Sequence, residues 1–250
     1  MAVSIKSARE IELMREAGKR LAHVHQELEA MIAPGISTWE IDAKGEKLIR
    51  DCGCIPNFLH YNGYPASICV SVNDEVVHGI PRKDRYLKEG DIVSLDAGLI
   101  YKGYHSDAAR THAVGKVSTE AQKLMDVTKQ SFFEGIKMAK EGQHLHDISR
   151  AIEEYVTPYG YGIVRDLVGH GIGTALHEDP QIPNYAQKRR GVRLQAGMTL
   201  AIEPMINAGT WQVRFLRDGW TVVTKDGSLS AHYEYTILVT DGEPEILTLY

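Results

Sequence analysis

The second half of the chain repeats landmarks of the first half at a constant distance. The pattern M-x-x-x-G occurs at 31–35 and again at 138–142, so Gly35 and Gly142 lie 107 positions apart (142 − 35). Gly53 and Gly160 are separated by the same distance (160 − 53). In both halves an isoleucine preceded by an acidic residue follows the first of these glycines by six positions. This regularity predicts a duplicated structural unit.

The order of the expected elements also repeats. Capping boxes that begin at Ser7 and at Ser37 predict the starts of two helices, and strand-like segments follow them. Past Gly115, two more helices over about 119–139 and about 147–156 precede further strands. We therefore expect an α+β fold with two pseudo-symmetric halves, each with two helices and antiparallel strands.

One domain is then expected over residues 1–250, with halves of about 1–117 and 118–250. A site at the seam between the halves would take residues from both of them.

Composition and charge exclude several classes of partner. The formal net charge of −5 gives no basic surplus, so we expect no DNA partner. No apolar run approaches the roughly 20 residues of a membrane span, and the first residues lack the apolar core of a secretory signal. Three cysteines are too few for a disulfide framework. We therefore expect a cytoplasmic protein without membrane contact, and a monomer, since nothing demands an oligomer.

Two aspartates interrupt a predicted β-hairpin of mostly apolar or aromatic residues. If Lys102 and Gly103 form a two-residue turn, Asp107 faces Gly98 across the hairpin. Asp96 then lies one diagonal step away on the same face, roughly 7–8 Å distant, so both carboxylates can reach one cation. The missing side chain at Gly98 would leave room for that ion. The alternative is a pair of aspartates that face solvent at an open sheet edge.

Three more polar residues stand in strands or at strand ends. His170 lies between two glycines after an apolar strand, and Glu203 stands in an apolar strand directly before Pro204. Glu234 interrupts the β-forming run AHYEYTILVT. Taken singly, His170 can be a hydrogen-bonded core residue and Glu234 a solvent-facing one. Clustered with the two aspartates, they form four carboxylates and one imidazole that need cations among them.

This set of five candidate ligands suits two divalent ions. One catalytic zinc usually takes three protein ligands and a water, whereas two ions roughly 3.5–4 Å apart share bridging carboxylates. Oxygen-rich ligation with one imidazole favours manganese, Fe(II) or cobalt over a thiolate-type zinc site. We expect two divalent metal ions, either Co, Mn, Fe(II) or Zn, whose identity the sequence leaves open.

In their order and context, these five residues resemble the metal ligands of methionine aminopeptidases. The resemblance runs from about Ala8 to Leu249 and includes YNGYPASICVSVNDEVVHGIP, GDIVSLDAG, GHGIG, LHEDP, IEPM and DGWTVVTKDGSLSAHYE. The chain resembles the bacterial type I branch. Only 33 positions separate His170 from Glu203 (203 − 170), which leaves no room for the insert of type II enzymes. The resemblance implies the "pita-bread" α+β fold with a curved central sheet.

The resemblance also implies an activity, the removal of the initiator methionine from nascent proteins whose second residue is small. Asp96, Asp107 and Glu234 would hold or bridge both ions, and His170 and Glu203 would complete one of them. A water or hydroxide between the metals would be the nucleophile, and Glu203 would act as its general base.

Substrate contacts follow from the same resemblance. His177 would hydrogen-bond the scissile carbonyl and stabilise the oxyanion, and His78 would contact the scissile-amide nitrogen or the next residue. The methionine pocket would be lined by Phe58, Tyr61, Tyr64, Cys69, Leu176 and Trp220. The chain departs from the common bacterial pattern at Phe58, Asn62, Val77, Leu176 and Tyr235, which leaves the pocket size open. Contact with the ribosome and the exact second-residue preference also stay open.

Two alternative functions remain. One is an Xaa-Pro dipeptidase or aminopeptidase of the same superfamily, although those proteins usually have an R-I-E-D context where this chain has HYEY. The other is a non-catalytic binding protein on the same fold, which the presence of all five candidate ligands disfavours.

Overall fold

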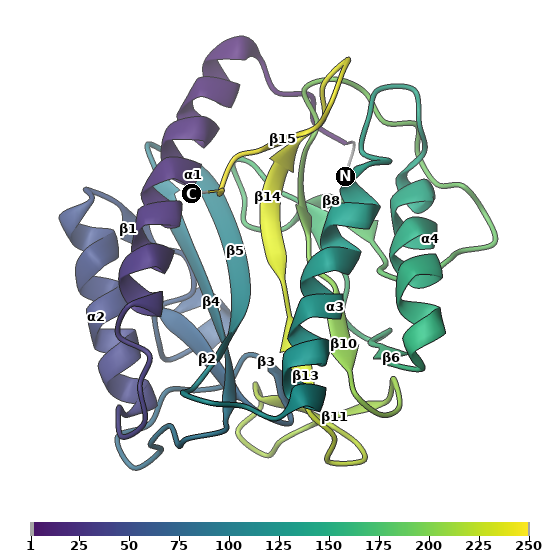
Figure 1. Ribbon diagram of the computed structural model, residues 1–250. Coiled ribbons are helices and arrows are strands. Elements are labelled where there is room, and N and C mark those ends of the chain that lie inside the picture. Colours follow the sequence, from purple (N-terminus) through teal and green to yellow (C-terminus); the bar gives the residue numbers. More distant parts are fainter. Residues whose placement is uncertain (1–2, 250) are drawn as a thin grey trace.

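The computed structural model describes residues 3–249 (Figure 1). Its helices are α1 (Ala8–Glu29), α2 (Thr38–Asp51), α3 (Thr119–Ile136), α4 (Leu145–Val156) and the short 3-10 helices η1 (Tyr61–Gly63) and η2 (Thr157–Tyr159). The strands before α3 are β1 (Ile55–Pro56), β2 (Ile68–Val72), β3 (Glu75–Val77), β4 (Ile92–Tyr101) and β5 (Tyr104–Ala113).

The strands after α4 are β6 (Gly162–Ile163), β7 (Gly169–Gly171), β8 (Glu178–Ile182), β9 (Thr199–Ile202), β10 (Met205–Asn207), β11 (Val213–Phe215), β12 (Val222–Thr224), β13 (Ser230–His232), β14 (Glu234–Leu238) and β15 (Glu245–Ile246). Two helices followed by antiparallel strands therefore occur twice. This confirms the predicted α+β arrangement.

Both predicted capping boxes are present, but the predicted end of the first helix is wrong. The side chains of Ser7 and Ser37 accept from the third helical N–H. In return, the backbone N–H of each serine donates to the carboxylate of that third residue, Glu10 or Glu40. The sequence predicts that the first helix continues to Pro34-Gly35, whereas α1 ends at Glu29. Past Glu29 the chain tightens into turns, in which the N–H groups of Met31 and Ile32 donate to the carbonyls of Leu28 and Glu29.

A nine-stranded antiparallel sheet joins the two halves. Its order is β1-β4-β5-β14-β9-β7-β8, with β2 also paired to β4 and β15 to β14. The pairing of β5 with β14 is the seam, since β5 comes from the first half and β14 from the second. Two smaller sheets, β13-β10-β6 and β11-β12-β3, complete the strands of residues 3–249.

The helices lie over one face of this sheet (Figure 1). On β4, Leu95, Ala97 and Leu99 belong to the main core together with buried side chains of all four α-helices. Because side chains alternate along a strand, Asp96 points to the opposite face. The core therefore fixes the sheet from the helical side and leaves the other face for polar side chains.

The duplication extends to backbone conformation. Gly35 and Gly142 have positive φ angles of 93° and 86°. Their N–H groups donate to the carbonyls of Leu87 and Leu194, which are also 107 positions apart (194 − 87). Both halves of the fold thus use the same turn at the same place.

Several predicted strands are shorter than the sequence suggests. The segment EVVHGI stops at Val77 because His78 adopts a positive φ of 58°. TLAIEPMI is divided between β9 and β10, since Pro204 has no N–H for a sheet hydrogen bond. These interruptions occur next to the polar residues of interest.

Candidate active site

A row of carboxylates crosses the sheet at the seam. On β5, Ala109 pairs with Asp96 of β4 on one side and with Glu234 of β14 on the other. Directly paired residues share a face of the sheet, and Asp107 shares it too because it lies two residues before Ala109. Three of the five candidate ligands are therefore brought together by strand register alone.

The predicted hairpin register is confirmed. Lys102 and Gly103 form the turn with positive φ angles of 49° and 85°, and Gly98 pairs with Asp107. A Cβ at Gly98 would lie 2.7 Å from Nδ2 of Asn57 and 3.1 Å from Oδ1 of Asp107. A side chain at Gly98 would therefore displace Asn57 and the Asp107 carboxylate. The room for an ion beside Gly98 stays a prediction.

The other two candidate ligands extend the row across the second half. The β14–β9 register, continued by one pair, places Glu203 opposite Glu234. On β7, His170 pairs with Ala201, which shares its face with Glu203. All five residues thus lie on one face of the sheet, four of them on the strands β4, β5, β14 and β7 and Glu203 directly after β9.

The repeat itself relates two of the candidate ligands. Asp96 and Glu203 are separated by 107 positions (203 − 96), the distance between the paired glycines. A carboxylate therefore occupies the equivalent strand position in each half. Applied to Asp96, the 107-residue offset of the glycines therefore leads to Glu203 from the sequence alone.

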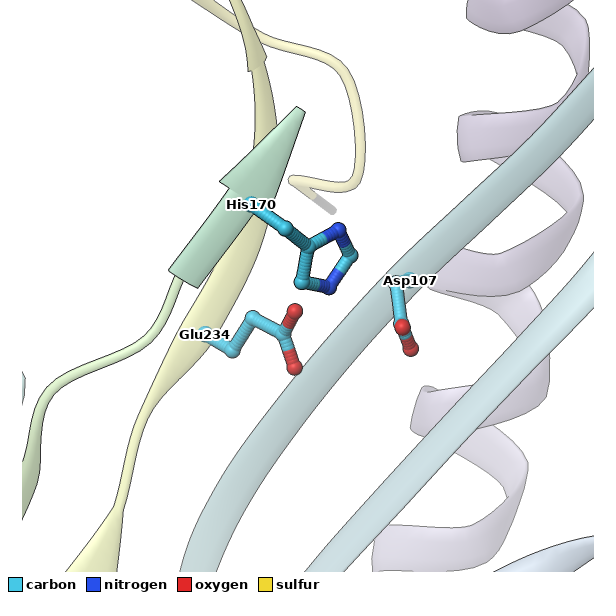
Figure 2. A group of neighbouring side chains, drawn as sticks. All are labelled: Asp107, His170 and Glu234. Atoms are coloured by element: carbon cyan, nitrogen blue, oxygen red, sulfur yellow. The ribbon is translucent and has the colours of Figure 1, made fainter. Parts of the chain in front are cut away.

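Three of the side chains converge closely (Figure 2). Asp107, His170 and Glu234 offer ligand atoms that all lie within 4.8 Å of one another. Nε2 of His170 lies 3.6 Å from Oε1 of Glu203. The Nδ1–H of His170 donates to the carbonyl of Gly171 at 2.9 Å, so Nε2 keeps its lone pair toward the carboxylates.

The acidic cluster needs positive charge. Among residues 3–249, Oδ1 of Asp96, Oδ1 of Asp107 and Oε1 of Glu234 are buried without a hydrogen-bond partner. Burial raises the pKa of Asp96 to about 7. Burial, followed by the neighbouring negative charges, raises the pKa of Asp107, Glu203 and Glu234 well above the usual range. A divalent cation would pair with these buried oxygens and lower the pKa of the four carboxyl groups.

The donor chemistry fits divalent metal ions. Burial lowers the pKa of His170 to about 3, so its imidazole is neutral at pH 7 and can act as a ligand. Four carboxylates and one imidazole form an oxygen-rich set of the kind preferred by manganese, iron or cobalt. The buried carboxylate oxygens without a hydrogen-bond partner fit such ions, because a bound cation would supply the missing partner.

A cavity of about 220 Å³ lies over the cluster. It is lined by the five candidate ligands and by Phe58, Tyr61, Asn62, Tyr64, Cys69, His78, Leu176, His177 and Trp220. The ring centroids of Tyr64 and Trp220 lie 5.2 Å apart in an edge-on contact. Burial raises the pKa of the Cys69 thiol well above its usual value, so this side chain is a neutral wall. The structure brings every site residue expected from the sequence to one cavity.

Two histidines beside the ligands remain neutral at pH 7. Burial lowers the pKa of His78 to about 4 and also lowers the pKa of His177. The rings of His177 and His170 meet edge-on, with centroids 4.4 Å apart. His78 has a left-handed backbone conformation, a strained state that non-glycine residues keep mainly at functional positions.

Two further residues support the site. Nε2 of His232 lies 3.8 Å from Oε2 of Glu203 and 3.9 Å from Oε2 of Glu234. Its sequence signal is its place two residues before Glu234 in an alternating run. Oγ1 of Thr236 accepts from the N–H of Asp107 at 3.0 Å and donates to its carbonyl at 2.8 Å. This contact joins the two halves directly beneath the ligands.

Comparison with known proteins agrees with this geometry. The chain is 53% identical over 247 residues to the methionine aminopeptidase of Clostridium acetobutylicum, with 99% of each chain covered. The structure matches methionine aminopeptidase from Thermotoga maritima with a TM-score of 0.97, 46% identity and complete coverage of both chains. It matches Xaa-Pro dipeptidase from Bacillus anthracis with a TM-score of 0.79 and 26% identity, over 98% of this chain and 61% of that one.

These likenesses confirm the expected pita-bread fold. Residues 12–241, which include the whole row of candidate ligands, match the model of metallopeptidase family M24. Because the family model matches most of the chain and a relative is 53% identical over 247 residues, the chain belongs to metallopeptidase family M24.

Proposed function

We propose that this protein is a metal-dependent methionine aminopeptidase that removes the initiator methionine from proteins with a small second residue. The observation that supports it most is that the acidic cluster and an apolar, aromatic pocket share one cavity of about 220 Å³. The full-length likeness to methionine aminopeptidases points to the same activity.

The five ligand residues divide the work of holding two divalent ions. Asp96, Asp107 and Glu234 would hold both ions, and His170 and Glu203 would complete the ligands of one of them. When bound, the ions would acidify the attacking water and polarise the scissile carbonyl. Glu203 would accept a proton from the attacking water and return it to the leaving amine.

The remaining cavity residues bind and orient the peptide. Phe58, Tyr64, Cys69 and Trp220 surround the methionine side chain, whose flexible thioether suits apolar and aromatic walls. A neutral His177 donates a hydrogen bond to the scissile carbonyl oxygen and stabilises the negative charge that develops there.

The identity of the metals and the cellular setting are part of the same proposal. The oxygen-rich ligands favour Mn, Fe(II) or Co, with Zn as the other candidate. None of the helices in residues 3–249 combines the length and the apolar character that crossing a membrane requires. The protein works as a cytoplasmic monomer on the methionyl ends of nascent proteins. Its free cysteines suit the reducing conditions of that compartment.

Substrate preference tests the activity. Turnover of Met-Ala-Ser and of an Ala-Pro peptide is measured with the metal-loaded enzyme, and Asp107→Asn serves as the control for contaminating peptidases. We expect cleavage of Met-Ala-Ser and negligible cleavage of the proline peptide. Preference for the proline peptide would make the chain an Xaa-Pro peptidase, and no cleavage of either would favour a binding role.

A further inference from the structure

The hydroxyl of Tyr61 is hydrogen-bonded to His177, the histidine proposed to donate to the scissile carbonyl. Oη of Tyr61 lies 2.8 Å from Nδ1 of His177, and the ring centroids are 5.5 Å apart. Within residues 3–249, the His177 ring forms no other hydrogen bond. We infer that Tyr61 is a positioning residue, whose O–H donates to Nδ1 and keeps the imidazole proton on Nε2 for the substrate. This role rests on the proposed function.

Acid strength decides the direction of this hydrogen bond. A proton on Nδ1 would make His177 the donor and Nε2 an acceptor, which could not stabilise an oxyanion. A phenol O–H is a stronger acid than a neutral imidazole N–H, so Tyr61 is the better donor. The nitrogen that carries the proton is set by the bond that the other nitrogen makes. Donation to Nδ1 also strengthens Nε2–H as a donor.

The backbone holds Tyr61 rigidly enough for this role. Tyr61 lies in the turn η1 between His60 and Asn62, which both have left-handed φ angles, 68° and 49°. Its N–H donates to the carbonyl of Phe58, and its carbonyl accepts from the N–H of Tyr64, both at 2.9 Å. Strained non-glycine conformations persist only where the surroundings fix them. The turn therefore presents the hydroxyl at one place.

The loop that contains His177 is anchored independently. The next residue, Glu178, accepts from Nζ of Lys6 at 2.6 Å and from the N–H of Thr174 at 2.8 Å. The His177 ring packs edge-on against His170. With the loop and one ring edge fixed, the remaining freedom of the imidazole is a flip that exchanges its nitrogens. The hydrogen bond to Tyr61 opposes that flip.

Kinetics of Tyr61→Phe test the role, because this variant keeps the ring and removes only the hydroxyl. For Met-Ala-Ser we expect kcat to fall about tenfold, less than the roughly 10²–10³-fold that removal of an oxyanion donor itself costs, with KM unchanged within about twofold. In a His177→Ala background the same change should have no further effect. The role would be overturned if Tyr61→Phe left kcat unchanged, or if it lowered kcat as much in the His177→Ala background as in the wild type.

A matched control separates this hydroxyl from tyrosine hydroxyls in general. Tyr104→Phe removes an O–H that donates to Oε1 of Glu10 at 2.9 Å, outside the cavity, and should leave kcat unchanged. A tenfold loss in Tyr104→Phe as well would show that the kinetic effect is not specific to Tyr61 and would count against the proposal.

Nitrogen NMR of the metal-free protein tests the proton arrangement without activity. At pH 8, above the ordinary imidazole pKa of roughly 6.5, ¹⁵N-labelled His177 should show an unprotonated Nδ1 in the wild type and a tautomer mixture in Tyr61→Phe. A protonated Nδ1 in the wild type would refute the inference. Wild-type protein that leaves Met-Ala-Ser uncut would instead contradict the proposed function, so the two failures are distinguishable.

Discussion

Asp107 is the most buried of the aspartates in the candidate metal centre, with 4% of its surface exposed. Replacement by asparagine preserves its shape and removes one negative charge. We expect Asp107→Asn to lower kcat/KM for Met-Ala-Ser by at least about 100-fold, more than loss of an outer partner of a metal ligand costs. Steady-state kinetics measure this, and activity above a tenth of the wild-type value would contradict a ligand role.

The same variant should keep its fold. Without metal, the buried Asp107 carboxylate is destabilised by burial and by its negative neighbours. A neutral amide avoids this repulsion. The free energy of unfolding of metal-free Asp107→Asn at pH 7, measured in urea, should therefore be no lower than that of the metal-free wild type.

Replacing His177 should affect kcat and KM differently. Removing one donor to a developing oxyanion typically lowers kcat by about 10²–10³-fold. We expect His177→Ala to lower kcat for Met-Ala-Ser by about 100-fold, with KM changed much less. A variant in which only KM changes would show that His177 binds the ground state and does not stabilise the oxyanion.

At this scale, the sequence identifies charges better than contacts. A carboxylate among core residues needs a partner, so Asp96, Asp107 and Glu203 stand out from their sequence neighbours alone. The bond between Tyr61 and His177 joins residues 116 positions apart (177 − 61) on two loops. No local pattern encodes such a contact, because it depends on how the loops lie in space.

Helix α1 approaches the backbone directly after β15 too closely for a side chain at Gly18. An added Cβ would overlap the backbone carbonyl of Leu247. Glycine to alanine normally stabilises a helix by about 1 kcal/mol. Here we expect Gly18→Ala to lower the free energy of unfolding by roughly 1–3 kcal/mol, measured by urea unfolding. The exposed neighbour Lys19→Ala is the control, and a Gly18→Ala protein as stable as wild type would contradict the close packing.

The contact between α1 and β5 makes stability depend on pH. His25 is 1% exposed, and its Nε2 lies 2.9 Å from the carbonyl oxygen of Ala108. Burial, then the charges of Arg110 and His112, lowers the pKa of His25 well below 6.5. The unfolded ring takes up a proton as the pH falls through about 6.5 while the folded ring does not, so stability is lost toward acid.

Replacement of His25 isolates this effect. Glutamine can still donate to the Ala108 carbonyl but does not titrate. Between pH 7.5 and pH 5, the loss of unfolding free energy should be smaller in His25→Gln than in the wild type by roughly 2 kcal/mol. Urea unfolding at both pH values gives the difference, and equal losses in the two proteins would contradict a neutral buried His25.

The starts of α1 and α2 were more predictable than the end of α1. Capping boxes fixed the first residues of α1 and α2 because they are local hydrogen-bond patterns. The end of α1 and the break between β9 and β10 depend on partners elsewhere in the chain or on the Glu203-Pro204 step. The short strands β1 and β8 (Glu178–Ile182) have no alternating apolar pattern, so only their pairing in the sheet defines them.

For the whole molecule, the repeat explains where the site lies. The seam between β5 and β14 brings Asp96 and Asp107 of the first half to His170, Glu203 and Glu234 of the second. The 107-residue offset predicted the seam, and it also relates Asp96 to Glu203. It did not predict the cavity walls, because Tyr61, His177 and Trp220 lie outside the repeated strands.

Turnover of Met-Ala-Ser by the chelated protein, measured while one metal at a time is added back, tests whether the acidic cluster is a catalytic metal centre. We expect no turnover without metal and a rise with Mn, Fe(II), Co or Zn that levels off by about two equivalents per chain, the capacity of a two-ion site with shared carboxylates. Full turnover in the chelated protein, or none with any of these metals, would contradict it.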